Sequence, residues 1–171
     1  SLARELANES KQSEVRRLAG LILKNSIDSR SYQTKKSLQQ KWLNQVDQNQ
    51  RMEIKSMIFQ ALSSPVQEIR HTAAQVVAKF AAAEIPAKQW PELIPQLQLS
   101  VSGPQSSTEL KQSTLEALGY ICEELSLNGE QGDDFGGMGG LDQTAVNTML
   151  TAIIQGMDKT ETNNEVRLAA C

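Results

Sequence analysis

A three-residue pattern of a glutamate, an aliphatic residue and a basic residue recurs along this chain. The aliphatic residue is Val15, Ile69, Leu110 or Val166, and successive copies are 54, 41 and 56 residues apart. An alanine follows a few residues after each copy, as expected if one type of helix is repeated. Spacings of about 40 to 47 residues are typical of solenoids built from paired helices. The two longer intervals each contain a segment that looks inserted, so the pattern predicts a repeated helical unit.

Residues 84–125 contain one such unit, which we expect to be two amphipathic helices joined by a short turn. Apolar residues of the second helix recur at three- and four-residue steps, at Leu110, Ala117, Leu118 and Ile121. Gly103 and Pro104 break the chain between the helices, and Ser106 with Glu109 predicts a capping box. A lone helical hairpin leaves its apolar stripe exposed. We therefore expect an all-α fold, an α–α superhelix (solenoid) of paired-helix repeats of the HEAT or armadillo kind.

The remaining segments predict how this single array is divided. We expect a partial repeat over residues 1–27, an inserted helix over 28–46, repeats over 47–84 and 85–126, a flexible glycine-rich insert over 127–141, and a truncated repeat over 142–171. Leu38 and Trp42, four residues apart, should anchor the inserted helix. Because both ends of the chain fall inside a repeat, we expect a fragment of a longer array.

The helix faces follow from the same spacing. On the helix expected over residues 13–27, the core side would hold Val15, Leu18, Ala19, Ile22 and Leu23. On the helix after Pro65, which Ser64 and Gln67 should cap, the buried residues would be Ile69, Ala73, Val76, Val77 and Phe80. The opposite side of that helix would carry His71, Ala74 and Ala78. Asp142 and a Thr162–Glu165 box should cap the last two helices.

Residues 129–140 hold six of the ten glycines together with three acidic residues. Such a segment buries too little surface to offset the entropy of ordering it, so we expect a solvated loop. No Gly-Lys-Ser/Thr follows, as a phosphate-binding loop would require. The alternating Asp/Asn pattern of a calcium loop is also absent.

Composition and charge narrow the class of function. The net charge of −3 does not indicate nucleic-acid binding, and no apolar run approaches the length of a membrane span. Two cysteines in helical contexts suggest a reducing compartment. With one histidine, His71, and no cluster of ligating or nucleophilic residues around it, we expect no catalytic residues, no metal, no cofactor and no enzyme activity.

Five strings carry a resemblance that covers essentially the whole chain. They are AEIPAKQWPELIPQL (83–97), STLEALGYIC (113–122), LTAIIQGM (150–157), LAGLILKN (18–25) and QQKWL (39–43). They resemble the importin-β (karyopherin-β) family of nuclear import receptors, in its amino-terminal part. The glycine-rich segment is longer than the family pattern. The resemblance implies a receptor that shuttles between cytoplasm and nucleus through the nuclear pore, and whose HEAT repeats line a concave surface with their second helices.

The resemblance also implies binding partners. Ran-GTP would bind the concave face, and the residues of our expected second helices that lie opposite the core are Arg17, Gly20, Leu21, Lys24, Gln112, Leu115, Glu116 and Gly119. Phe-Gly nucleoporins would bind the outer face, where Leu150, Thr151 and Ile154 would form one wall of a pocket. Importin-α and cargo would bind through a carboxy-terminal part that this chain lacks.

Two other classes of protein remain as alternatives. A HEAT scaffold of the phosphatase or vesicle-coat type would share the repeat period but not the strings quoted above. An enzyme domain with a helical shell would need a polar catalytic constellation, which the sequence does not contain.

Overall fold

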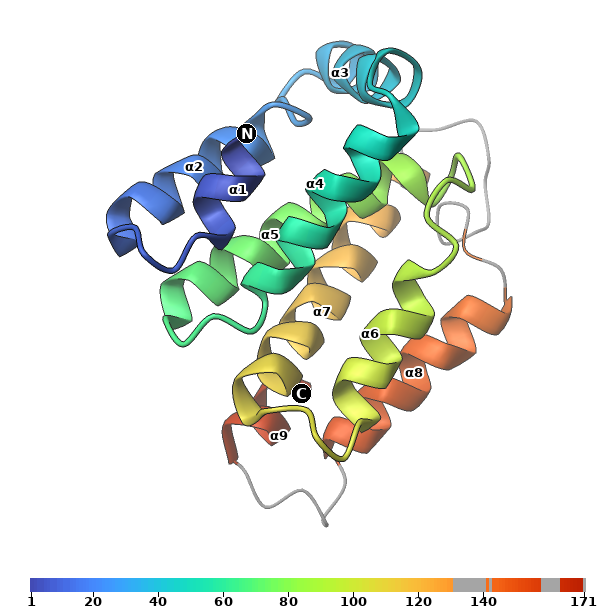
Figure 1. The fold of residues 1–171 in the computed structure, drawn as a ribbon. Helices are drawn as coiled ribbons and strands as arrows, with labels where there is room; N and C mark the ends of the chain where they lie inside the picture. Colours follow the sequence, from blue (N-terminus) through green and yellow to red (C-terminus); the bar gives the residue numbers. More distant parts are fainter. Residues whose placement is uncertain (131–140, 142, 158–163, 171) are drawn as a thin grey trace.

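The computed structural model describes residues 1–130, 141, 143–157 and 164–170, and the regular secondary structure of that part is entirely α-helical (Figure 1). The helices before residue 90 are α1 (Leu2–Ala7), α2 (Ser13–Asn25), α3 (Tyr32–Gln45), α4 (Gln48–Ala61) and α5 (Gln67–Glu84). Those after it are α6 (Leu93–Ser102), α7 (Thr108–Glu130), α8 (Gln143–Met157) and α9 (Asn164–Ala170).

All of these helices except α3 lie in two layers. The second helices α2, α5, α7 and α9 follow one another in one layer, and each contacts the next. The first helices α1, α4, α6 and α8 form the other layer, in which α1 contacts α4 and α6 contacts α8 (Figure 1). Each first helix also contacts the second helix that follows it in its pair. The expected solenoid of paired helices is therefore confirmed.

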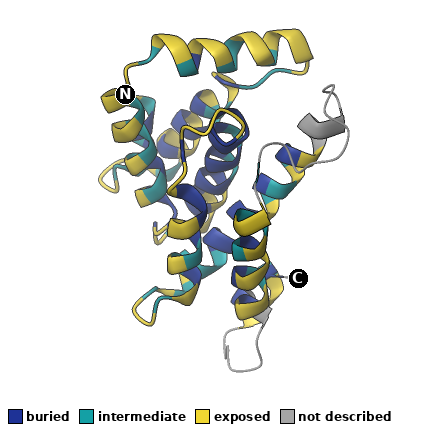
Figure 2. Cartoon of the chain, turned by 90° about the vertical axis from the view of Figure 1, so that its right-hand side faces the viewer, coloured by how far each residue is buried: buried dark blue, intermediate teal, exposed yellow. Residues whose placement is uncertain are grey.

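Helix α5 is buried on nearly all sides because α2 and α7 flank it and α4 covers it (Figure 2). The five residues expected in its core are buried, and His71 is exposed. The expectation that Ala74 and Ala78 face outward is wrong, since both are at most 1% exposed. A helix between two neighbours needs small residues on its flanks, where large side chains would keep the helices apart.

Helix α3 docks on the array through Trp42. The Trp42 ring meets Phe80 edge-on, with 4.6 Å between ring centroids. Its Nε1 donates to Glu84 Oε1 at 2.8 Å. Glu84 is fully buried, and its carboxylate is neutralised by Lys55 Nζ at 2.6 Å and Arg51 Nη1 at 3.6 Å. The expected anchoring role of Trp42 is confirmed, and most of the remaining surface of α3 is exposed (Figure 2).

Helix α2 is rotated from the expected orientation. Ala19 and Leu23 are buried as expected, but Val15, Leu18 and Ile22 are 45%, 57% and 47% exposed. The helix packs against α1 and α5, and no described element covers its remaining side. The apolar residues expected on the core side of α2 therefore extend beyond the part of its surface that α1 and α5 cover.

In the first two copies of the repeated pattern, the basic residue is a buried connector rather than a surface charge. Arg16 Nε donates to the Leu6 carbonyl at 3.0 Å, and its Nη2 donates to Ser64 Oγ at 3.1 Å. In the next copy, Arg70 Nη1 donates to the Ser64 and Pro65 carbonyls at 2.9 and 3.1 Å. Both arginines thus satisfy polar groups in the bends between helices, which would otherwise be buried without partners.

The helix boundaries correct several expected caps. Helix α5 begins at Gln67, so Pro65 lies before its first turn, and the N-cap residue Val66 makes no side-chain cap. In α7 the cap is Ser107 rather than Ser106, since Ser107 Oγ accepts from the Leu110 N–H at 3.2 Å. The caps predicted at Asp142 and Thr162 lie outside the described residues.

The glycine-rich insert begins later than expected. Residues 127–130, placed in a flexible insert from the sequence, form the last turn of α7. Residues 131–140 lie outside the described part of the chain.

Because α2 packs closely on α5, any larger residue at Gly20 should destabilise the fold. A Cβ at Gly20 would lie 2.5 Å from Thr72 Cγ2 and 3.1 Å from Leu6 Cδ1. Gly20→Ala should therefore lower the free energy of unfolding by about 1–2 kcal/mol in urea denaturation, although alanine is the better helix former.

The matched test is the double variant Gly20→Ala/Thr72→Ser. Serine removes the clashing methyl group but keeps the hydroxyl that donates to the Glu68 carbonyl at 2.8 Å. The double variant should recover most of the loss. A Gly20→Ala protein as stable as the parent would show that the two helices are not in close contact here.

Candidate functional site

The second helices expose one continuous polar strip, which we call the second-helix face. It consists of Arg17, Leu21, Lys24, His71, Gln75, Lys79, Gln112, Glu116, Gly119 and Tyr120. Hydrogen bonds link neighbouring helices across it, and Arg17, His71 and Glu116 line a single hollow of about 270 Å³. The strip is therefore one surface rather than three separate helix faces.

Most of the residues predicted to bind on this side do lie on the second-helix face. Arg17 and Gly119 are exposed, and a Cβ at Gly119 would meet nothing within 4 Å. Leu21, Gln112 and Glu116 are partly buried. Lys24 is partly buried, and its Nζ donates a hydrogen bond to Gln75 of α5.

Two predicted residues, Gly20 and Leu115, do not lie on this surface. Gly20 is buried against Thr72 of α5. Leu115 is 2% exposed, and its Cδ1 would be 2.7 Å from a Cβ at Gly156 of α8. Both are five residues after the aliphatic residue of the repeated pattern, as is the buried Ala74. This position faces the next repeat, so reading it as the side opposite the core was wrong.

A chain of hydrogen bonds crosses the second-helix face. Lys24 Nζ donates to Gln75 Oε1 at 3.2 Å, and Gln75 Nε2 lies 2.9 Å from His71 Nε2. His71 Nδ1 lies 3.4 Å from both Glu116 Oε2 and the Tyr120 hydroxyl. Sequence reasoning missed Gln75 and Tyr120; the i, i+4 spacing of residues 71 and 75 on the polar stripe of α5 was the available signal.

The phenol of Tyr120 stays protonated over an unusually wide pH range. Burial raises its pKa, and a hydrogen bond from Gln75 offsets this in part. The negative charges of Glu116 and Glu123 raise it further. Tyr120 is therefore a neutral hydroxyl at the α7 side of the strip.

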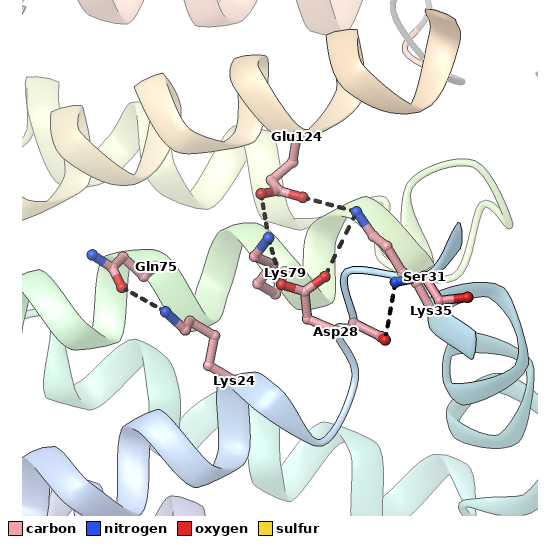
Figure 3. A network of polar contacts seen from close by, with 8 residues as sticks. Lys24, Asp28, Ser31, Lys35, Gln75, Lys79 and Glu124 are labelled. Carbon is pink, nitrogen blue, oxygen red and sulfur yellow. Dashed lines mark hydrogen bonds and ion pairs between the residues drawn. The ribbon is translucent and has the colours of Figure 1, made fainter. Parts of the chain in front are cut away.

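Beside the hydrogen-bond chain lies an ionic cluster of two cations and two anions (Figure 3). Lys79 Nζ of α5 is 2.8 Å from Asp28 Oδ2, which follows α2, and also pairs with Glu124 of α7. Lys35 Nζ of α3 is 3.1 Å from Glu124 Oε2 and 3.9 Å from Asp28 Oδ1. The cluster therefore ties α3 and the end of α2 to α5 and α7.

The environment of Lys79 favours its charged form. Burial by itself would lower the pKa of Lys79, but hydrogen bonds and charges from Asp28 and Glu124 outweigh burial and raise the pKa above its ordinary value of 10.5. Lys79 is therefore a permanent cation at neutral pH, held between two carboxylates.

On the opposite side of the array, the first helices carry exposed apolar residues. Leu150 and Ile154 of α8 are 51% and 65% exposed, and Thr151 between them is exposed. The three residues predicted as one wall of a pocket thus lie together on the solvent side of α8. This side of the first helices, with the two grooves described next, is called the first-helix face.

Two grooves separate neighbouring first helices. The groove between α4 and α6 has a volume of about 610 Å³, and Met52, Phe59 and Leu99 supply apolar surface. The groove between α6 and α8 has about 430 Å³ and is lined by Ile94 and Ala145 among others. Sequence reasoning missed both, although the apolar Met52 and Leu99 stand at positions exposed by 51% and 68%.

Three further features of the described residues concern metal binding, membrane crossing and thiol reactivity. They contain no group of three or more His, Cys, Asp or Glu side chains arranged to hold a metal. No helix within the described part of the chain has the length and apolar content needed to cross a bilayer. Burial raises the pKa of the Cys122 thiol, which keeps it in the less reactive protonated form.

Comparison with known proteins gives one consistent result. The family model of the Importin-beta N-terminal domain matches residues 1–64. Importin subunit beta-1 of Arabidopsis thaliana is 44% identical over 99% of this chain, which spans 18% of that relative. The chain belongs to the importin-β family. Since it spans under a fifth of the relative's length, the function of the whole relative does not transfer to it directly.

Two solved structures of Kap95p, the yeast importin-β, extend this family likeness to the fold. One is the structure in which Kap95p binding induces the switch loops of Ran-GDP to adopt the GTP-bound conformation, with a TM-score of 0.85. The other is a complex of Kap95 with Nup1, with a TM-score of 0.83. Each is 33% identical to this chain, and the match covers 99% of this chain and 18% of Kap95p.

The ionic cluster should contribute measurably to the stability of this importin-β segment. Lys79→Met leaves Asp28 and Glu124 with one cation fewer, and should cost about 1–2 kcal/mol of unfolding free energy. Because folding raises the pKa of Lys79, its contribution is complete below about pH 10.5 and is lost only as pH rises through the raised value.

Urea denaturation at several pH values between about 6 and 9 should therefore give one constant difference between Lys79→Met and the parent. Lys41→Met, which removes an exposed lysine of α3, is the control and should be nearly neutral. A Lys79→Met effect no larger than the control would show that the cluster does not stabilise the fold.

Proposed function

We propose that this chain is part of a nuclear import receptor that binds Ran in its GTP form through the second-helix face. The observation that carries the proposal is the 33% identity, over 99% of the chain, to a Kap95p that was solved bound to Ran. In that structure the switch loops of Ran adopt the GTP-bound conformation. From this induced GTP-like conformation of Ran-GDP, we infer that a receptor containing this chain binds the GTP form of Ran in preference to the GDP form.

The geometry of the second-helix face supports this assignment. Arg17 and Glu116 offer charges of opposite sign beside a hollow in which side chains of a partner would fit. Gly119 leaves open space on α7, so a partner's backbone could approach the helix closely. Polar, mixed-charge surfaces of this kind favour specific docking and fast association over sheer affinity.

Reversing the two basic charges that α2 contributes to the second-helix face tests the proposed face. In a full-length receptor containing this chain, Arg17→Glu/Lys24→Glu should weaken binding of Ran-GTP about tenfold or more, which corresponds to about 1.4 kcal/mol or more. Binding is measured by surface plasmon resonance with Ran loaded with GTP or GDP.

The control Lys36→Glu/Lys41→Glu makes the same charge change on the exposed side of α3 and should leave Ran binding unchanged. Ran-GTP binding of parental strength by the α2 variant would exclude this face. No preference for the GTP form by the parent receptor would count against the proposed function itself.

We further propose that the first-helix face contributes to binding Phe-Gly segments of nucleoporins. The likeness to the Kap95 complex with Nup1 supports a nucleoporin partner. Leu150, Thr151 and Ile154 offer an exposed apolar wall on α8, and apolar surface of this kind marks interaction sites more often than scattered exposed residues do. The opposite wall of this pocket would belong to a repeat beyond this chain.

A charge on that wall should weaken nucleoporin binding selectively. Ile154→Asp in the full-length receptor should reduce binding of a Phe-Gly peptide about tenfold, because a carboxylate would be desolvated against an aromatic ring. Gln40→Asp, which adds the same charge on exposed α3, should have no effect. Binding is measured by fluorescence anisotropy of a labelled peptide.

Ran-GTP binding by the Ile154→Asp receptor distinguishes a local effect from damage to the fold. It should remain within about twofold of the parent, since Ile154 is 65% exposed and lies on the other side of the array. Equal loss of both activities would mean that the pocket assignment fails.

The remaining features of the proposal follow from the family. Importin-α and cargo would bind parts of the receptor outside this chain, and the receptor would act in cytoplasm, nucleus and nuclear pore without catalysing a reaction. Membership of the importin-β family argues against the phosphatase-type or coat-type scaffold.

A further inference from the structure

His71 is the single histidine of the chain, and its neighbours determine which ring nitrogen carries the proton. Lys24 Nζ can only donate, so the Gln75 atom that faces it must be the oxygen. The Gln75 amide nitrogen then faces His71 Nε2 at 2.9 Å, so Nε2 must be the acceptor. The proton of neutral His71 therefore resides on Nδ1, where Glu116 and Tyr120 accept or share it.

Protonation of this ring breaks the chain of hydrogen bonds. A proton on Nε2 would point at the Gln75 amide nitrogen, so two donors would meet where a donor and an acceptor met before. Rotating the Gln75 amide would restore that bond, but it would turn the amide nitrogen toward Lys24, which again is a donor. No orientation of Gln75 can satisfy both Lys24 and a protonated His71.

We propose that His71 is a proton-sensitive joint of the second-helix face. With neutral His71, Lys24 of α2 is tied through Gln75 to α5. With protonated His71, Gln75 turns to the imidazolium and the Lys24 ammonium is released to solvent or to a partner. Histidine is the side chain that ordinarily changes charge between about pH 5 and 8.

Charged groups from three helices surround the ring. Arg17 and Lys24 on α2 oppose a positive ring, whereas Glu68 on α5 and Glu116 on α7 favour it. Tyr120, also on α7, meets the ring edge-on and remains neutral. The imidazolium would keep its contact with Glu116, which then becomes an ion pair.

The joint changes the charge and the mobility of one defined part of the second-helix face. It adds one positive charge at His71 and frees a second at Lys24, so a partner with acidic groups over α2 and α5 would bind more tightly at lower pH. The inference holds whether or not Ran is the partner, because it rests only on bonds within this chain.

Nuclear magnetic resonance of the ¹³C,¹⁵N-labelled chain tests the proposal directly, since the one imidazole needs no assignment. At about pH 8 the ring nitrogen shifts should report a proton on Nδ1 and a bare Nε2. A neutral ring with its proton on Nε2 would overturn the proposal.

A pH titration from about 8 to 5 provides the second test. The side-chain amide signals of Gln75 and the Cε signals of Lys24 should move with the same midpoint as His71. The Cε signals of Lys36, an exposed lysine of α3, should not move. Gln75 signals that stay fixed while His71 titrates would overturn the coupling.

A neutral substitution separates the hydrogen-bond effect from simple electrostatics. Gln75→Met removes the opposing donor without changing charge, so the titration midpoint of His71 should move to higher pH. Gln112→Met removes an amide from α7 that has no bond to His71 and should leave the midpoint in place. An unchanged or lowered midpoint in Gln75→Met would show that Gln75 does not resist protonation.

Discussion

Close contact between successive second helices determines the arrangement of the rest of the chain. Small residues make this contact possible: Gly20 lies against Thr72, and Ala74 and Ala78 are buried in α5. Because α5 and α7 each lie between two other second helices, only a narrow strip of each reaches solvent. The polar residues of α2, α5 and α7 are therefore confined to one aligned surface, and the first helices are left to form the other side.

The sequence pattern predicted the number of helices around residues 48–125 and most of their core residues, because apolar spacing reflects burial within one hairpin. It could not determine the helix rotations. A second helix has an apolar side toward its own hairpin and further sides toward two neighbouring repeats, and one-dimensional spacing does not distinguish these. Gly20 and Leu115 were misplaced for this reason, as were Val15, Leu18 and Ile22. The choice between Ser106 and Ser107 depended on a single residue of helix register.

The polar clusters were beyond sequence reasoning for a different reason. Asp28 and Glu124 approach the same ammonium although they are far apart in the chain, and no local pattern relates them. Lys24, Gln75 and His71 likewise meet only because α2 packs on α5. The candidate residues that the structure does place on the second-helix face were found because exposed polar positions recur at helical spacing. Their bonding partners required the packed array.

The buried carboxylate of Glu84 gives this chain a built-in optical reporter. Both tryptophans contact the same ion pair, one at each partner. Trp42 donates its indole N–H to Glu84. Lys55, which is bonded to the other carboxylate oxygen, lies 4.8 Å from the ring centre of Trp90. Undocking of α3 would expose one indole to water and alter the electric field at the other. Intrinsic fluorescence therefore follows the attachment of this helix to the array without any added label.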